Sequence, residues 1–257
     1  MILAVLNNKG GVGKTTTAVN LAAALAATSR RVLLVDLDSQ ASASLWCGVP
    51  PGRLKPSAAS VLLQDFPVAD AIRNTSTPGL DLLTGSIELA NADLALAEVR
   101  GRESTLARAL RLIRDRYDMI VLDCPPSLSL IAVNAAVAAD GVIVPVSPQP
   151  LAISALGAVI GSLDTIRRRL AANSRLLGIL ISMTDESGDA RDTAELVRLI
   201  REEHRDRVFT TEIGFSSALR NAPAAARTVF ALAPRSSSAR AFRALAAEVV
   251  GRLEAES

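Results

Sequence analysis

The fold of this chain is decided by the stretch Asn7-Asn8-Lys9-Gly10-Gly11-Val12-Gly13-Lys14-Thr15-Thr16. It follows an apolar run at 2–6 and precedes a helical pattern that begins near Lys14. Glycines allow the backbone to curl until its N–H groups point at phosphate oxygens, and the following helix adds the partial positive charge of its N-terminus. Strand, glycine loop and helix in this order predict a phosphate-binding loop rather than a turn that binds nothing.

The side chains of this loop carry the chemistry. We expect Lys14 to reach the β- and γ-phosphates of a nucleotide and the Thr15 hydroxyl to ligate Mg²⁺. A generic phosphate loop has its first glycine where this chain has Asn8, and a second lysine, Lys9, follows directly. The chain has 28 basic residues, and lysines occur only at 9, 14 and 55. Two of them therefore lie in the loop, which favours a function for both. The residues predicted to bind the nucleotide here are Lys9, Gly10, Gly11, Val12, Gly13, Lys14, Thr15 and Thr16.

Length and composition limit the possibilities. A chain of 257 residues with 49% hydrophobic and 21% charged residues is predicted to form a single globular domain spanning 1–257. Cys47 and Cys124 lack metal-ligand spacing and are expected to be buried thiols in a reducing compartment. No signal peptide is visible. The longest apolar stretches, 128–144 and 151–163, are interrupted and fall short of the roughly 18 apolar residues that a membrane span needs. A cytoplasmic protein is expected.

Apolar strand patterns alternate with helical periodicity along the chain. Strands are predicted at 2–6, 32–35, 80–83, 119–123, 141–146, 176–183 and 208–213, and helices at 14–29, 86–98, 103–115, 128–138, 151–170, 189–204 and 236–254. Glycines and prolines indicate a loop at 47–57. This alternation predicts an α/β fold with a doubly wound, mainly parallel sheet flanked by helices. Such sheets bind ligands at the carboxyl ends of their strands.

Three aspartates are predicted to lie at that edge of the sheet. Asp36 and Asp38 follow the strand at 32–35, and Asp123 ends the strand at 119–123. Bound Mg²⁺ keeps several waters, so Asp36 and Asp123 are candidates to hold it through water. Asp38 could reach past the γ-phosphate and orient or deprotonate the attacking water. The alternative for Asp36 and Asp38 is that they only cap the helix that follows.

Four segments carry a resemblance to a known family. The segments are 9–16, 34–41, 118–126, and the C-terminal pair 228–236 and 241–246. The first resembles the deviant Walker A motif of the ParA/MinD family of P-loop ATPases. The second resembles the family's next motif, with Ser39 where Pro is usual, and the third its Walker B and switch segment. The C-terminal pair is similar to the end of ParA-type partition ATPases.

The resemblance implies a nucleotide-dependent homodimer that sandwiches two ATP molecules, with Mg²⁺. It implies that Lys9 crosses the interface to the partner's phosphates and that Asp38 activates water, so Lys9, Lys14 and Asp38 are the expected catalytic residues. A second cation beside the triphosphate offsets charge that the loop amides cannot neutralise. Adenine is expected near Met183–Thr184 and the Phe215–Pro223 loop, although Ala226 occupies a place where relatives often have Gly.

Branches of the family differ in what they bind besides ATP. The cysteines do not fit the cluster ligands of iron-protein relatives, and the CxxC of assembly factors is absent. Membrane-bound MinD-type members end in a basic amphipathic helix with bulky apolar anchors. This chain ends in the acidic stretch 252–257 without an aromatic anchor, which argues against stable membrane binding. A membrane-associated, MinD-like regulator of division or flagellar placement remains the alternative.

Arginines concentrate near the C-terminus. The segment 213–247 holds five arginines and no acid, and 198–252 holds ten arginines against five acids, a local charge of +5. Because the whole chain carries +2, the remaining residues sum to −3. A basic end favours sequence-independent binding of double-stranded DNA. The alternative is a solvated helix face with ordinary salt bridges. The candidate DNA contacts are Arg198, Arg220, Arg235, Arg240 and Arg243.

Together these features predict a nucleoid-associated ATPase that positions a cargo. A cargo-bound partner protein is expected to stimulate hydrolysis and release the ATPase from DNA. The cargo could be a plasmid, a chromosome origin, or a protein body such as a carboxysome.

Overall fold

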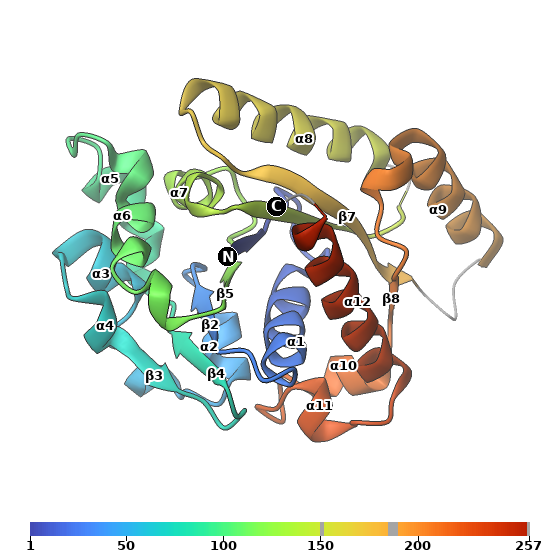
Figure 1. Ribbon diagram of the computed structural model, residues 1–257, viewed down its shortest axis with the longest axis horizontal. Helices are drawn as coiled ribbons and strands as arrows, with labels where there is room; N and C mark the ends of the chain where they lie inside the picture. Colours follow the sequence, from blue (N-terminus) through green and yellow to red (C-terminus); the bar gives the residue numbers. More distant parts are fainter. Residues whose placement is uncertain (150–151, 185–189, 256–257) are drawn as a thin grey trace.

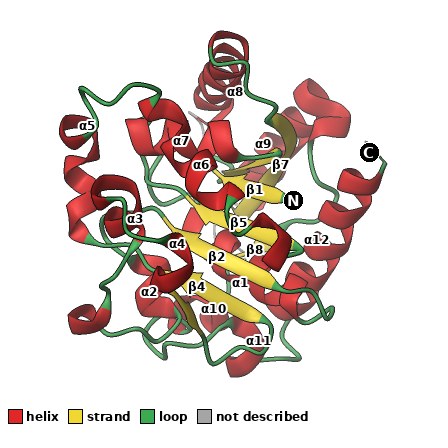
Figure 2. Ribbon diagram, turned by 60° about the vertical axis from the view of Figure 1, so that its left-hand side comes forward, coloured by secondary structure: helices red, strands yellow, loops and turns green. Residues whose placement is uncertain are grey.

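The computed structural model describes residues 1–149, 152–184 and 190–255. Eight strands within these ranges form one sheet in the order β3-β4-β2-β5-β1-β6-β7-β8 (Figures 1 and 2). Their bounds are β1 Ile2–Val5, β2 Val32–Asp36, β3 Ile72–Asn74, β4 Leu80–Leu83, β5 Met119–Asp123, β6 Gly141–Val146, β7 Arg175–Thr184 and β8 Ile213–Gly214. Only the β3–β4 pairing is antiparallel. The expected doubly wound, mainly parallel sheet is confirmed.

Helices cover both faces of this sheet (Figure 1). The α-helices are α1 Lys14–Ala26, α2 Ser42–Trp46, α3 Ala58–Gln64, α4 Val68–Ala71, α5 Ala92–Ala95, α6 Thr105–Arg111, α7 Leu130–Ala138, α8 Ala152–Arg169, α9 Ala190–His204, α10 Ser217–Asn221, α11 Val229–Leu232 and α12 Ser237–Glu254. The predicted helix starts at 151 and 189 lie outside the described residues. α12 begins as predicted from its serine cap, since the Ser236 hydroxyl accepts the Ala239 N–H at 3.1 Å.

Two apolar cores lie on opposite faces of the sheet because successive strand side chains point to opposite sides. Leu33 and Val35 of β2 join the core formed with α3, α6, α7 and α8. Val32 and Leu34 join the core formed with α1 and α12. β1, β2, β5 and β6 are buried along their whole length, as central parallel strands with helices on both faces must be.

The predicted strand at 208–213 is wrong in its extent. Val208 makes a single bridge to Ile179, and the strand β8 comprises only Ile213–Gly214. Between them, the Thr210 and Thr211 N–H groups donate to the carboxylate of Glu248 on α12, at 2.7 and 3.1 Å. A side chain from the C-terminal helix therefore takes the backbone donors that a strand would have used.

The predicted helices at 86–98 and 103–115 are too long. The first is a 3₁₀ helix at Ile87–Asn91 followed by the short α5, and the second is α6 between two 3₁₀ turns. Ile87 is 65% exposed and Leu94 is 81% exposed, so the apolar stripe that would hold a long helix on the core is broken. β3 and α2 were not predicted, because they have only three and five residues.

The topology places the functional edge. β2, β5 and β1 are neighbours, and Asp36 pairs in register with Asp123, which pairs with Val5 just before the glycine loop. The strand ends that carry the aspartates and the loop therefore meet at one edge of the sheet.

Candidate functional site

The glycine loop between β1 and α1 adopts a conformation that needs glycine. Gly11 and Gly13 have φ of 73° and 81°, in the left-handed region that side chains rarely adopt. α1 begins directly at Lys14, and Gly13 is its N-cap residue without a capping side chain. The first amides of a helix have no partner within it, so a loop of this shape offers donors and a positive dipole end to an anion.

Two neighbouring cavities open at this edge. One of about 280 Å³ is lined by the glycine loop, Asp38, Pro126 and Met183. The other, of about 210 Å³, lies at the loop's far side and shares Gly13, Thr16 and Met183 with the first. Its remaining lining is Thr17, Ser182, Ile213, Gly214, Phe215, Leu219, Arg220 and Pro223. The structure thus brings Asp38, Met183, Pro223 and all the predicted loop residues except Lys9 and Val12 to the lining of two adjoining cavities.

The two lysines of the loop behave differently. Lys14 is largely buried, and its ammonium donates to the Lys9 carbonyl at 2.8 Å. Burial lowers the pKa of Lys14, and Asp123 and Asp38 act against that shift. The Lys9 ammonium instead donates to Oε1 of Gln149, which follows β6, at 2.5 Å. Lys9 is not among the residues that line either cavity within the described chain.

The two buried aspartates also differ. Asp36 is fully buried, and its carboxylate accepts hydrogen bonds from Ser44 and from the Asp38 N–H. Burial raises its pKa to about 6, while the bonds from Ser44 pull it down. Ser44 is the third residue of α2, so the Asp36 carboxylate caps that helix by accepting an N–H group of its first turn. Both proposed roles of this residue therefore stay open.

Asp123 is fully buried but lacks such donors. Neither of its oxygens has a hydrogen-bond partner within the described residues, although the Thr15 hydroxyl is close enough to lower its pKa. Burial first, and then Asp36, raise that pKa well above its usual value. A buried carboxylate without partners is unfavourable unless a cation or its waters compensate for it.

This donor set fits a magnesium ion bound with a nucleotide. Mg²⁺ prefers oxygen ligands, keeps several waters and usually takes one or two carboxylates plus phosphate oxygens. The Asp123 carboxylate and the Thr15 hydroxyl supply such oxygens beside the glycine loop. No group of three His, Cys, Asp or Glu residues that could hold a metal alone occurs in the described part of the chain. The site therefore suits an ion that arrives with phosphates.

Asp38, the residue expected to activate water, lies beside the glycine loop. Its side chain is half-buried and lines the same cavity as Lys14 and Thr15. One carboxylate oxygen accepts the Gln40 N–H at 2.9 Å, and its carbonyl accepts the Ala41 N–H at 3.0 Å. Asp38 thus sits in a tight turn whose backbone is fixed on both sides.

The second cavity, which is largely apolar, contains Phe215, the first residue of the loop at 215–223 where adenine was expected. Phe215, 41% exposed, follows β8, and the guanidinium of Arg220 lies 5.9 Å from its ring centre. An exposed ring beside an apolar cavity suits a stacked base. Arg220, predicted to contact DNA, lines this cavity.

The other candidate DNA contacts separate into two locations. Arg235, Arg240 and Arg243 are exposed around the start of α12, and none of the ion pairs among the described residues involves them. Arg243 lies 5.1 Å from the ring centre of Phe230. Arg198 is on α9, where it pairs with Glu202 at 2.8 Å. The arginines around α12 form a cluster. Arg198 instead belongs to a solvated helix face, where it makes an ordinary salt bridge.

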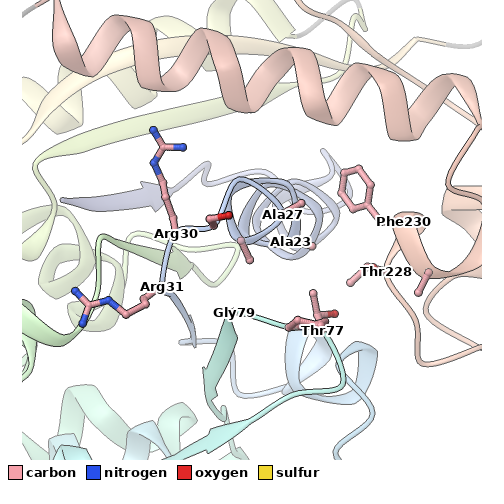
Figure 3. A pocket seen from close by; sticks show the side chains of 12 residues that line it. Ala23, Ala27, Arg30, Arg31, Thr77, Gly79, Thr228 and Phe230 are labelled. Carbon is pink, nitrogen blue, oxygen red and sulfur yellow. The ribbon is translucent and has the colours of Figure 1, made fainter.

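A separate cavity of about 620 Å³ lies at the other end of α1 (Figure 3). Its lining includes Arg30 and Arg31, just before β2, and Gly79, just before β4. In Figure 3 the two arginine side chains point away from each other, and Phe230 lies across the cavity. Arg30, Arg31 and Gly79 lie at the starts of strands, at the edge of the sheet opposite the glycine loop. No carboxylate is among the residues that line this cavity. We therefore do not assign the nucleotide to this cavity.

Comparison with known proteins gives a consistent assignment. The family model described as "AAA domain" matches residues 1–177. The chromosome-partitioning ATPase Soj of Thermus thermophilus is 39% identical over 252 residues, covering 98% of this chain and 96% of that protein. The chromosome partitioning protein ParA of Caulobacter vibrioides is 33% identical over 253 residues, covering 98% and 94%.

A solved structure described as cobyrinic acid a,c-diamide synthase from Mycobacterium smegmatis, with bound ADP and magnesium, has a TM-score of 0.86. It is 30% identical and covers 100% of this chain and 96% of that one. Glycine loop, carboxylates and sheet order define a P-loop nucleotide-binding protein. The chain belongs to the ParA/MinD family of P-loop ATPases, with Soj and ParA partition ATPases among its relatives.

Proposed function

We propose that this chain is a ParA-type ATPase that binds ATP with Mg²⁺ and hydrolyses it slowly until a partner stimulates it. The observation that supports this most is that the glycine loop, Lys14, Thr15 and Asp38 line one cavity, which adjoins an apolar one. A nucleoside triphosphate needs both a polar cavity for phosphates and an apolar one for the base. The relative from M. smegmatis holds ADP and magnesium.

The residues divide the chemistry between them. The loop amides and the Lys14 ammonium bind the β- and γ-phosphates, and Phe215, Met183 and Pro223 hold the adenine. Asp123 and Thr15, with Asp36 behind them, hold Mg²⁺, the carboxylates acting through water. When bound, the ion neutralises charge on the phosphate oxygens.

Asp38 is proposed to orient the attacking water and take its proton. A carboxylate in the phosphate cavity can do this only if its geometry is held, because proton transfer needs hydrogen-bond reach. The Gln40 and Ala41 amides hold the Asp38 turn in place. Asp38 itself is half-buried, so it can contact both protein donors and a water in the cavity.

Lys9 is proposed to act across a homodimer. Its ammonium donates to Gln149, and Lys9 lines neither cavity of its own chain. A second chain facing the glycine loop would offer the ammonium another set of phosphates. Two ATP molecules would then be enclosed between two subunits. Each γ-phosphate receives Lys14 from its own chain and Lys9 from the partner.

The dimer is proposed to bind double-stranded DNA without sequence preference, which would make it nucleoid-associated. Arg235, Arg240 and Arg243 supply exposed positive charge that no carboxylate in the described chain neutralises. Phosphate contacts of this kind do not depend on sequence. A cargo-bound partner would stimulate hydrolysis and release the dimer, so that a plasmid, chromosome origin or protein body is positioned.

The C-terminal helix favours DNA over a membrane as the surface that is bound. Phe242, Leu245 and Val249 of α12 are fully buried against α1 and the sheet, so they do not form a free apolar face for lipid. No helix among the described residues is long and apolar enough to cross a bilayer. The burial of the apolar face of α12 disfavours the MinD-like alternative.

ATP turnover with and without DNA tests the proposal. We expect slow Mg²⁺-dependent hydrolysis that DNA raises, and none in Lys14→Ala, because that ammonium holds the phosphates. Retained ATP affinity in Lys14→Ala would refute the assignment of the phosphate loop. ATP-dependent pelleting with liposomes, without DNA binding, would instead support the membrane alternative.

A further inference from the structure

The end of β2 is held by a residue from α2. The Asp36 Oδ2 atom accepts the Ser44 N–H at 2.8 Å and the Ser44 hydroxyl at 2.7 Å. Its Oδ1 atom accepts the Asp38 N–H at 3.1 Å. Asp36 and Ser44 are both fully buried. Hydrogen bonds to a buried carboxylate are strong and directional, so they fix its orientation.

The network continues to the neighbouring strand. The Ser44 hydroxyl accepts the Gly85 N–H at 2.9 Å, just after β4. The Ser44 hydroxyl therefore donates to Asp36 and accepts from Gly85. A Cβ atom at Gly85 would lie 2.6 Å from the Asp38 carbonyl oxygen and 2.8 Å from the Asp36 carboxylate. Only glycine lets the loop after β4 approach the Asp36 carboxylate and the Asp38 carbonyl this closely.

We propose that Ser44 and Gly85 are positioning residues for ATP hydrolysis. They fix the Asp36 carboxylate, which fixes the Asp38 backbone, and this keeps the Asp38 side chain in the phosphate cavity. Neither residue is among those that line that cavity, so each acts through Asp36 and Asp38. The inference rests on the proposed role of Asp38 in turnover.

The turn at Asp38 explains why a small displacement matters. The Asp38 carbonyl accepts the Ala41 N–H, and its side chain accepts the Gln40 N–H, so backbone and side chain move together. A larger side chain at position 85 would push against the Asp38 carbonyl and thereby displace the Asp38 carboxylate. Displacing a reacting group by about 1 Å can lower a rate by roughly 100-fold.

The test is steady-state ATP hydrolysis by the full chain with DNA, separating kcat from KM. We expect Ser44→Ala to lower kcat by about 10-fold with KM for ATP within about 2-fold, because Asp38 acts on water and does not bind the nucleotide. Gly85→Ala is expected to lower kcat by about 100-fold. Ser57→Ala is the matched control. Its hydroxyl is equally buried and bonds Ser86 at 2.9 Å, beside Gly85 but with no hydrogen bond to Asp36, so its kcat should stay at the wild-type value.

Three outcomes would overturn the proposal. The first is a wild-type kcat in Ser44→Ala, and the second is an equal loss in Ser44→Ala and Ser57→Ala, which would indicate general destabilisation. The third is a rise in KM alone. Asp38→Ala is measured alongside. Full turnover in Asp38→Ala would refute the proposed role of Asp38 itself, whereas an inactive Asp38→Ala beside a fully active Ser44→Ala would refute the positioning role only.

Discussion

Replacing Arg235, Arg240 and Arg243 with Glu is expected to flatten the salt dependence of DNA binding. Arg240 and Arg243 donate to the Arg235 and Pro234 carbonyls, which gathers the cluster at the start of α12. Each phosphate contact contributes about −0.9 to the slope of log affinity against log salt, so losing three contacts in a subunit should change the slope by about 2.7 for each subunit that contacts the DNA. Between about 50 and 200 mM salt, wild-type affinity should therefore fall about 40-fold more than that of the variant for each such subunit.

Fluorescence anisotropy with a labelled DNA duplex and ATP measures this slope at several salt concentrations. The matched control replaces Arg108, Arg111 and Arg116 with Glu, in and after α6. It changes the net charge equally at a different place, and α6 belongs to the opposite core from α12. A slope that is unchanged in the α12 variant, or flattened equally in the control, would refute a DNA site at α12.

Three further substitutions test the site and the fold. Phe215→Ala should weaken ATP binding about 10-fold in calorimetry, because a base loses its stacking ring, yet leave tripolyphosphate binding unchanged; an equal loss for both would refute the base assignment. Asp123→Asn should remove Mg²⁺-dependent turnover but raise the unfolding free energy of the nucleotide-free protein at pH 7. Burial raises the Asp123 pKa because it penalises the ionised form. The group's contribution to stability is therefore greatest below its unfolded pKa of about 3.8, where it is protonated, and is lost as pH rises. The gain from Asn should shrink towards acid pH, and a loss of stability at pH 7 would contradict this. Phe242→Ala should lower the unfolding free energy by about 3–5 kcal/mol in urea titration, and a loss below about 1 kcal/mol would show that α12 is not part of the core.

Sequence periodicity predicted the functional edge because strand ends in a parallel sheet are fixed by the strands themselves. Asp36 and Asp123 each end a buried apolar strand, and their register follows from the pairing of β2 with β5. The glycine loop was equally predictable, since its φ values require glycine at 11 and 13. In both cases a pattern within one short segment was sufficient, because that segment alone determines where its strand ends or how its loop is shaped.

The end of the predicted strand at 208–213 and the division of the arginines depended on contacts between distant segments. Glu248 on α12 accepts the amides before β8, and Phe215 lines the apolar cavity directly after β8. The run of arginines could not be divided by sequence alone. The fold places Arg220 at the apolar cavity and Arg198 on α9, apart from the cluster on α12.

The support around Asp38 was also hidden from the sequence. Ser44 and Gly85 are ordinary residues in their own segments, and only the pairing of β2 with β4 brings the loop after β4 against Asp36. Close approach of two backbones is a property of the tertiary structure. A sequence pattern can name Asp38, but it cannot name the residues that hold it.

The central claim is that ATP joins two chains through Lys9. Its most direct test is the solution mass of Asp38→Ala with Mg·ATP, a variant expected to keep its nucleotide, measured with and without Lys9→Ala. The account predicts a dimer for Asp38→Ala and a monomer for the double variant, which should still bind ATP through Lys14. A dimer that persists without Lys9, or a monomer of Asp38→Ala saturated with ATP, would contradict it.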